Sequence, residues 1–233
     1  ALIVAKKNKD KPGIAGINTI YGIINVRWGK FEKAVTFFEK ALKHRAKEKN
    51  IQEEAKILNN LGHCYTQLGH FDKALESSNR SLDLKREISD KKGIAASLFQ
   101  TSLIYRRVSD YAKAIKYSNE SIELFDELNI TMYDCILKMN LGLYLVFVGN
   151  FEDARSNFNE AIKISKKMND FGSLGMCHRG IGLIYLDMGK WNLAQKEFKK
   201  ANNFHKKAEH TNAFEATTVF LGMTYFFEEK YEK

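Results

Sequence analysis

Side-chain amides recur at a fixed spacing of 40 residues in this chain, at Asn60, Gln100 and Asn140. An amide carries a hydrogen-bond donor and an acceptor together, so each one can pair with a peptide unit of an extended ligand. Amides repeated along one surface would hold a peptide backbone whatever its sequence. The alternative is that the same side chains cap helices or face solvent. The spacing therefore makes them candidate peptide-binding residues.

The side chains that usually carry out catalysis or bind metals are scattered. The sequence contains no C-x-x-C, H-x-x-x-H or G-x-x-x-x-G-K pattern, and no nucleophile with a recognised catalytic spacing. We therefore expect no enzyme activity, no metal and no cofactor, and we interpret the cysteines as free buried thiols of a reducing compartment. The scattered residues are Cys64, Cys135, Cys177, His44, His63, His70, His178, His205 and His210.

Aromatic residues mark the elements that must position these amides. They recur every 40 residues, and an alanine follows three residues after each of the first five. A fixed period of this length indicates an array of stacked units, each stable only against its neighbours. The fold predicted is all-α, a right-handed α-solenoid of antiparallel helix pairs. The aromatic positions are Phe31, Phe71, Tyr111, Phe151, Trp191 and Tyr231.

Apolar residues spaced three and four apart place two amphipathic helices in each unit. The first helices are predicted near residues 14–28, 51–68, 91–108, 131–148, 171–188 and 211–227. The second helices are predicted near residues 31–48, 71–88, 111–127, 151–168 and 191–207. Asn50, Asp90, Asn129 and Asp170 stand at the turns between units, where their side chains can cap the backbone.

The whole chain is predicted to be one array. Five full helix pairs cover residues 14–50, 51–90, 91–130, 131–170 and 171–210, with partial repeats at 1–13 and 211–233. Ala1 and Leu2 align with residues inside second helices, and Tyr231 aligns with the first residue of another. We therefore expect the chain to be a fragment of a longer array.

The repeated residues resemble those of the tetratricopeptide repeat family. Leu61-Gly62, Tyr65, Gly69, Phe71, Ala74 and Ser81 follow its pattern, as do Ile181-Gly182, Tyr185, Gly189, Trp191, Ala194 and Ala201. The unit of 40 residues is longer than the family norm of about 34 residues. Such long units resemble those of the LGN/Pins adaptors, kinesin light chains, Rap-type regulators and bacterial signalling proteins.

The resemblance implies that the first helices line a concave groove that binds a peptide or a partner helix. The partner could also be another segment of the parent chain. We expect the module to be a cytoplasmic sensor or scaffold in a larger bacterial signalling protein. The candidate groove residues are Asn59, Asn60, His63, Phe99, Gln100, Arg106, Met139, Asn140, Leu143, Arg179 and Phe220.

Charge and hydropathy leave two other functions open. Residues 1–50 hold twelve Lys and Arg against four Asp and Glu, so a nucleic-acid-binding array remains an alternative, less favoured than solvated helix ends. Self-assembly through uncapped ends is another. Apolar residues crowd the C-terminal half and are either core or a docking patch. No stretch approaches the roughly 20 apolar residues of a membrane span, so we expect no membrane partner.

Overall fold

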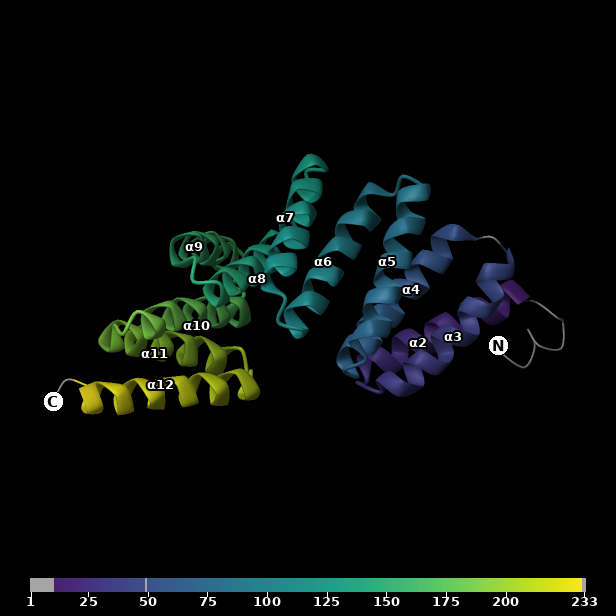
Figure 1. The fold of residues 1–233 in the computed structure, drawn as a ribbon. Coiled ribbons are helices and arrows are strands. Elements are labelled where there is room, and N and C mark those ends of the chain that lie inside the picture. Colours follow the sequence, from purple (N-terminus) through teal and green to yellow (C-terminus); the bar gives the residue numbers. More distant parts are fainter. Residues whose placement is uncertain (1–10, 49, 232–233) are drawn as a thin grey trace. The chain divides into compact units, whose positions relative to one another are not determined.

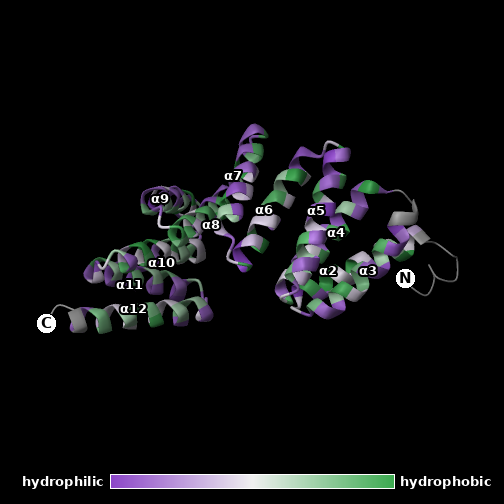
Figure 2. Ribbon diagram, in the orientation of Figure 1, coloured by the Kyte–Doolittle hydropathy of each residue, from purple (hydrophilic) through white to green (hydrophobic). Residues whose placement is uncertain are grey.

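The computed structural model describes residues 11–48 and 50–231, and all the regular secondary structure in these ranges is helical (Figure 1). The first helices of the repeats are α2 (Lys11–Arg27), α4 (Ile51–Gln67), α6 (Lys91–Arg107), α8 (Asp134–Phe147), α10 (Phe171–Asp187) and α12 (Thr211–Tyr231). The second helices are α3 (Phe31–Glu48), α5 (Phe71–Glu87), α7 (Tyr111–Glu127), α9 (Phe151–Met168) and α11 (Trp191–Lys207). The all-α prediction is confirmed. Hydrophobic and hydrophilic residues alternate around the helices, as amphipathic packing requires (Figure 2).

Glycines with a positive φ angle form most of the turns between the two helices of a repeat. Gly29, Gly69, Gly149 and Gly189 have φ between 67° and 77° in four of the turns inside repeats. At Gly69 the turn carries the two hydrogen bonds of a Schellman motif, because His70 donates to the Tyr65 carbonyl and Gly69 to the Thr66 carbonyl. A glycine tolerates this left-handed conformation without strain. The glycines that recur before the aromatic residues therefore serve the turns.

Capping side chains mark the start of three first helices. Asn50, Asp90 and Asp170 each accept a hydrogen bond from the backbone N–H three residues later. Ile130 stands at the equivalent place in the fourth repeat, and its aliphatic side chain cannot accept a hydrogen bond. Helix α8 begins only at Asp134. The prediction that this helix starts near residue 131 is therefore wrong. Tyr133, at the N-cap of α8, makes no side-chain capping hydrogen bond either.

Two further boundaries differ from the prediction. Helix α2 begins at Lys11 rather than at residue 14, since a proline is tolerated in the first turn of a helix, where Pro12 lies. Helix α12 continues to Tyr231, where we expected a turn near residue 229. Glu229 stands there in place of the glycine found in four other repeats. The alignment of Ala1 and Leu2 with a second helix lies outside the described residues.

Small residues let the two helices of a repeat approach closely. Ala34, Ala74, Ala114, Ala154 and Ala194 have no accessible surface. In the fifth repeat a Cβ atom added to Gly182 would lie 2.5 Å from the ring of Phe198, which itself is fully buried. Such contact is possible only when one partner lacks a side chain. The recurrent glycine of the first helix therefore packs against a phenylalanine ring of the second at Gly22, Gly142 and Gly182, whereas Gly62 packs against Ser78.

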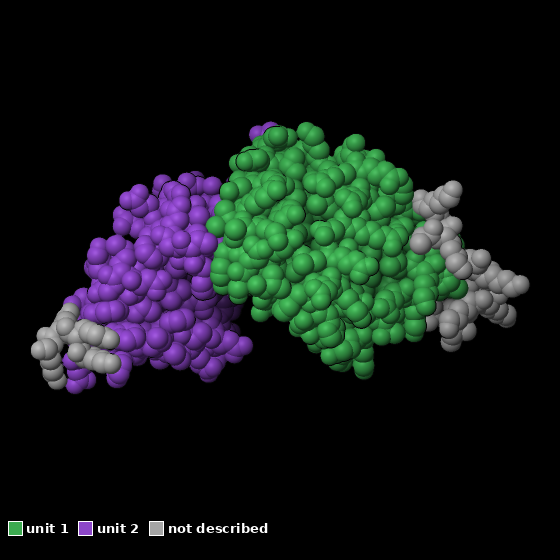
Figure 3. Space-filling model, viewed as in Figure 1, with its two compact units in different colours: residues 1–128 green, residues 129–233 purple. Residues whose placement is uncertain are grey.

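The chain divides into two compact units, residues 1–128 and 129–233 (Figure 3). Helices α2–α7 lie in the first unit and α8–α12 in the second. Inside each unit a first helix packs on its own second helix, which packs on the next first helix. Neighbouring first helices also touch, whereas no comparable contact joins second helices in the described part of the chain. The first helices therefore line the inner side of each unit.

Candidate functional site

A pocket of the second unit gathers four of the predicted groove residues. Met139, Asn140 and Leu143 enter it from α8, and Arg179 enters it from α10. The remaining lining residues are Phe158, Met176, Gly180 and Leu183, and the cavity volume is about 30 Å³. This volume is that of about two water molecules or the tip of one aliphatic side chain. The pocket combines apolar walls with an amide and a guanidinium.

Arg179 is the charged group of this second-unit pocket. Its side chain is half-buried, and it makes no ion pair within the described ranges of the chain. Burial lowers the pKa of its guanidinium from the ordinary value. A desolvated cation without a counter-ion is costly, and an anion placed beside it would remove part of that cost. The pocket is therefore electrostatically suited to a ligand that carries an acceptor or a negative charge.

Gly180 explains why the row of amides stops in the second unit. A Cβ atom at Gly180 would lie 2.3 Å from the ring of Phe158, so the ring occupies the space of a side chain. Phe158 comes from α9 and is 1% exposed. The ring closes the floor of the pocket, and no amide can stand at residue 180 while it does so.

Asn140 and Phe220 do more than line a groove, because each also contacts other parts of the fold. The Asn140 side chain donates from Nδ2 to the Ile136 carbonyl at 2.7 Å, within its own helix. Its Oδ1 accepts no hydrogen bond from any described residue, so an acceptor remains at the pocket. Phe220 lies on α12 and stacks on Phe198 with ring centroids 5.9 Å apart. Phe220 thus contributes to packing between helices as well as to the face.

The other six candidates lie in the first unit on two neighbouring helices, and all are half-buried. Asn59, Asn60 and His63 belong to α4, and Phe99, Gln100 and Arg106 belong to α6. We call these six residues the first-unit face. The α4 and α6 helices are in contact, so the structure brings the two groups of residues together. Their role in binding stays a prediction, as does that of the second-unit pocket.

Individual contacts distinguish the members of the first-unit face. Asn59 Oδ1 accepts a hydrogen bond from Ser97 Oγ at 3.2 Å. The His63 ring meets Phe31 edge-on at 6.0 Å, and burial lowers the pKa of His63. The Nε atom of Arg106 is buried without a partner. The His63 ring and the Nε atom of Arg106 are therefore shielded from water, and Arg106 Nε lacks a hydrogen bond.

The apolar residues of the C-terminal half separate into core and surface. Val146 is buried and Phe227 stacks on Trp191 at 5.3 Å, whereas Phe147, Met223 and Phe226 are exposed. Part of this apolar region is therefore core, and part is exposed surface. Four of the twelve basic residues of residues 1–50 lie outside the described residues, namely Lys6, Lys7, Lys9 and Lys49.

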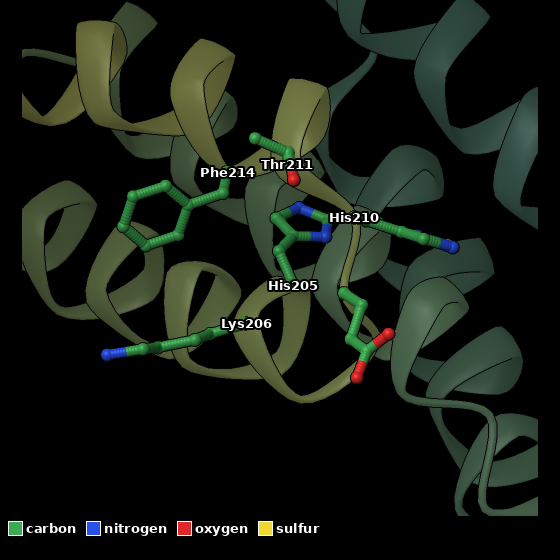
Figure 4. A pocket seen from close by; sticks show the side chains of 6 residues that line it. His205, Lys206, His210, Thr211 and Phe214 are labelled. Atoms are coloured by element: carbon green, nitrogen blue, oxygen red, sulfur yellow. The ribbon is translucent and has the colours of Figure 1, made fainter.

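A second pocket, which the sequence did not indicate, lies where α11 turns into α12 (Figure 4). Its volume is about 240 Å³, and it is lined by His205, Lys206, Glu209, His210, Thr211 and Phe214. His205 forms its floor with no accessible surface, and neither ring nitrogen has a hydrogen-bond partner. Burial, assisted by the charges of Arg179 and His210, lowers the pKa of His205 to about 4. The imidazole is therefore neutral at physiological pH.

Burial keeps two of the three thiols of the described residues protonated. Cys64 and Cys177 are fully buried, and burial raises the pKa of the two thiols to about 11 and about 12. A thiol held protonated in this way is a poor nucleophile. Across residues 11–48 and 50–231, His, Cys, Asp and Glu form no group that could hold a metal ion. In the same ranges, no helix is long and apolar enough to cross a membrane.

Comparison with known families accounts for the repeated geometry. Two models described as tetratricopeptide repeats match the sequence, one over residues 53–127 and the other over residues 15–47 and 137–168. Together the matched segments cover more than half of the chain. The chain belongs to the tetratricopeptide repeat family. No curated protein sequence matches this tetratricopeptide repeat protein.

Solved structures share this fold at low sequence identity. A signal transduction ATPase with numerous domains and a tetratricopeptide repeat sensor, from Pyrococcus horikoshii, is 17% identical with a TM-score of 0.78, over 90% of this chain and 32% of that chain. Aspartyl phosphate phosphatase F from Bacillus subtilis is 17% identical with a TM-score of 0.75, over 97% of this chain and 58% of that chain. A Rap protein complexed with competence and sporulation factor is 15% identical with a TM-score of 0.66, over 93% of this chain and 64% of that chain. This tetratricopeptide repeat chain therefore spans less than two thirds of each.

Proposed function

We propose that this tetratricopeptide repeat protein is an interaction module whose first helices bind a peptide or a helix of a protein partner. The observation that carries the proposal is the second-unit pocket, where Met139 and Leu143 meet Arg179 beside Asn140. Binding sites for peptides combine apolar pockets for side chains with a few polar groups that fix orientation. The pocket offers both on neighbouring helices that pack on one another.

We further propose that the chain serves as the sensor or scaffold part of a larger cytoplasmic regulatory protein. Two likenesses support this assignment. The Pyrococcus ATPase uses a tetratricopeptide repeat as a sensor, and the Rap protein was solved with competence and sporulation factor bound. The proposal includes no reaction, because an amide, a guanidinium and apolar walls can hold a ligand without transforming it.

Selection from a display library of random 12-residue peptides tests the binding function. We expect peptides to be enriched on the protein and to lose binding when Leu143→Asp introduces a charge into the apolar wall. A carboxylate there removes an apolar contact and neutralises Arg179 in the same pocket, so binding should weaken by about tenfold or more. Affinities of the enriched peptides for each variant, measured by calorimetry, give the result.

Leu193→Asp is the matched control, because Leu193 is 44% exposed on the second helix α11. This variant should bind the peptides as the unchanged protein does. Circular dichroism of both variants confirms that the helices persist. A library that yields no enriched peptide, or peptides that bind the Leu143→Asp variant with unchanged affinity, would refute the proposal.

A further inference from the structure

A buried lysine lies directly behind the first-unit face. Lys85 belongs to α5 and is 5% exposed. Its Nζ donates to Ser97 Oγ at 2.7 Å, and it makes no ion pair within the described part of the chain. Burial lowers the pKa of Lys85, while the nearby charge of Asp90 acts in the opposite direction. A buried cation with a hydroxyl as its partner is unusual, since buried charges are normally paired.

The chemistry of the lysine fixes the direction of the hydrogen bonds. An ammonium group has donors only, so the Ser97 oxygen must accept from it. The Ser97 proton then points to Asn59 Oδ1, 3.2 Å away. Ser81 Oγ is farther from Ser97, at 3.5 Å, and gives its own proton to the Ala55 carbonyl. The chain of donors therefore runs from Lys85 through Ser97 to Asn59.

This chain of hydrogen bonds leaves the amide donors of Asn59 free. One lone pair of its Oδ1 accepts from Ser97, and its Nδ2 donates to no described residue, so both N–H groups are available to a ligand. Hydrogen bonds in series polarise one another, and a positive charge at the head of the series strengthens the last donor. Asn59 therefore presents free, polarised donors that suit an oxygen acceptor of a ligand.

Packing alone does not explain the arrangement. At the position of Lys85 the other repeats carry Arg45, Phe125, Ser165 and His205. At the position of Ser97 they carry Ile17, Ile57, Leu137, Cys177 and Thr217. Apolar residues thus fill the Ser97 position in three other repeats, and Phe125 fills the Lys85 position in one. The combination of lysine, serine and asparagine occurs once, next to the first-unit face.

We propose that Lys85, acting through Ser97, is a positioning residue that makes Asn59 a donor for a carboxylate of the bound peptide. The inference rests on the proposed function and names the ligand class of its first-unit face. Charge favours a carboxylate over a neutral carbonyl, because none of the six residues of that face is acidic and Arg106 adds a second cation. In the second unit, Arg179 lacks a counter-ion in the same way and independently favours an acidic peptide.

Two blocked hexapeptides test the inference, hexaglutamate and its neutral isostere hexaglutamine. We expect hexaglutamate to shift the side-chain amide signals of Asn59 in a proton–nitrogen correlation spectrum, and hexaglutamine to shift them far less. Lys85→Met should weaken the hexaglutamate affinity by about fivefold to tenfold, because the charge-assisted donor is lost. The signals of free Asn59 should also move, since its amide is no longer held in one orientation.

Lys92→Met is the matched control. Lys92 is exposed on α6, so this variant removes one positive charge from the surface of the same unit. It should change the hexaglutamate affinity by less than about twofold at physiological salt. Equal losses in the Lys85→Met and Lys92→Met variants would show a simple net-charge effect and overturn the inference.

The remaining outcomes separate this inference from the proposed function. If hexaglutamate and hexaglutamine bind equally, or if hexaglutamate leaves the Asn59 signals unmoved while library peptides bind, the carboxylate assignment is wrong and peptide binding stands. If the library yields no peptide, the proposed function falls and the role of Lys85 falls with it.

Discussion

At the scale of single residues, the polar groups that matter most are those that burial leaves without a full set of partners. Lys85 has one hydroxyl partner, Arg179 has no counter-ion among the described residues, and both ring nitrogens of His205 lack a hydrogen bond. Each of these groups costs stability in the free protein. Two of the three, Lys85 and Arg179, lie beside first-helix faces, where a ligand could supply what is missing.

His205 should make stability depend on pH. The unfolded chain binds a proton at the ordinary histidine pKa of about 6.5, while the pKa of the folded state is about 4. Between these values the unfolded state holds more protons, so stability falls as the pH drops from 6.5 to 4, by at most about 3 kcal/mol. The variant His205→Phe should lose much less over this range, which urea unfolding at several pH values would measure.

Phenylalanine is a suitable replacement because Phe125 occupies the same repeat position and is 2% exposed. The His44→Phe variant is the control, since His44 is only half-buried. Identical pH dependence in the unchanged protein and the His205→Phe variant would show that another group controls the acid response.

At the scale of the element, a capping side chain marks the start of the first helix α10. Asp170 accepts from the backbone N–H of Ser173 at 3.0 Å and from its hydroxyl at 2.6 Å, and these bonds lower the pKa of the Asp170 carboxyl. The fourth repeat has Ile130 at this place, and its helix begins at Asp134. The late start of α8 thus coincides with a missing side-chain acceptor at residue 130, although α5 and α11 start in register without a side-chain cap.

Removal of the cap should reproduce that late start in another repeat. In the Asp170→Ala variant we expect residues 171–173 to lose helical carbon chemical shifts and the free energy of unfolding to fall by about 1 kcal/mol. Asp126→Ala, which removes an exposed carboxylate from α7, should leave both quantities unchanged. Helical shifts that persist at residues 171–173 would show that packing, and not the cap, fixes the start of α10.

At the scale of the whole molecule, stability is built from contacts between neighbouring helices. Every substantial contact in the described residues joins helices that are consecutive, or that are the first helices of adjacent repeats. In such arrays the free energy of unfolding is close to a sum over repeats and their interfaces. A local defect should therefore have a local effect.

The variant Phe198→Ala tests this local behaviour. Phe198 is fully buried against Gly182, and its truncation should cost about 3–5 kcal/mol. We expect amide hydrogen exchange to accelerate in α10, α11 and α12 and to change much less in α3 and α4. Uniform acceleration over all helices would show instead that the chain unfolds as one cooperative body.

The sequence alone determined the repeat, the helix pairs and the family, because a 40-residue period and helical spacing are local properties that every unit repeats. It also selected Met139, Asn140, Leu143 and Arg179, since the shared register of the first helices brings these residues together. The tertiary structure decided what burial and neighbours do to each side chain. The ring of Phe158 beneath Gly180 and the hydrogen bonds from Lys85 through Ser97 to Asn59 depend on contacts between residues distant in the sequence. A periodic pattern states which positions are equivalent, whereas the hydrogen bonds and desolvation at each position depend on side chains that differ from repeat to repeat.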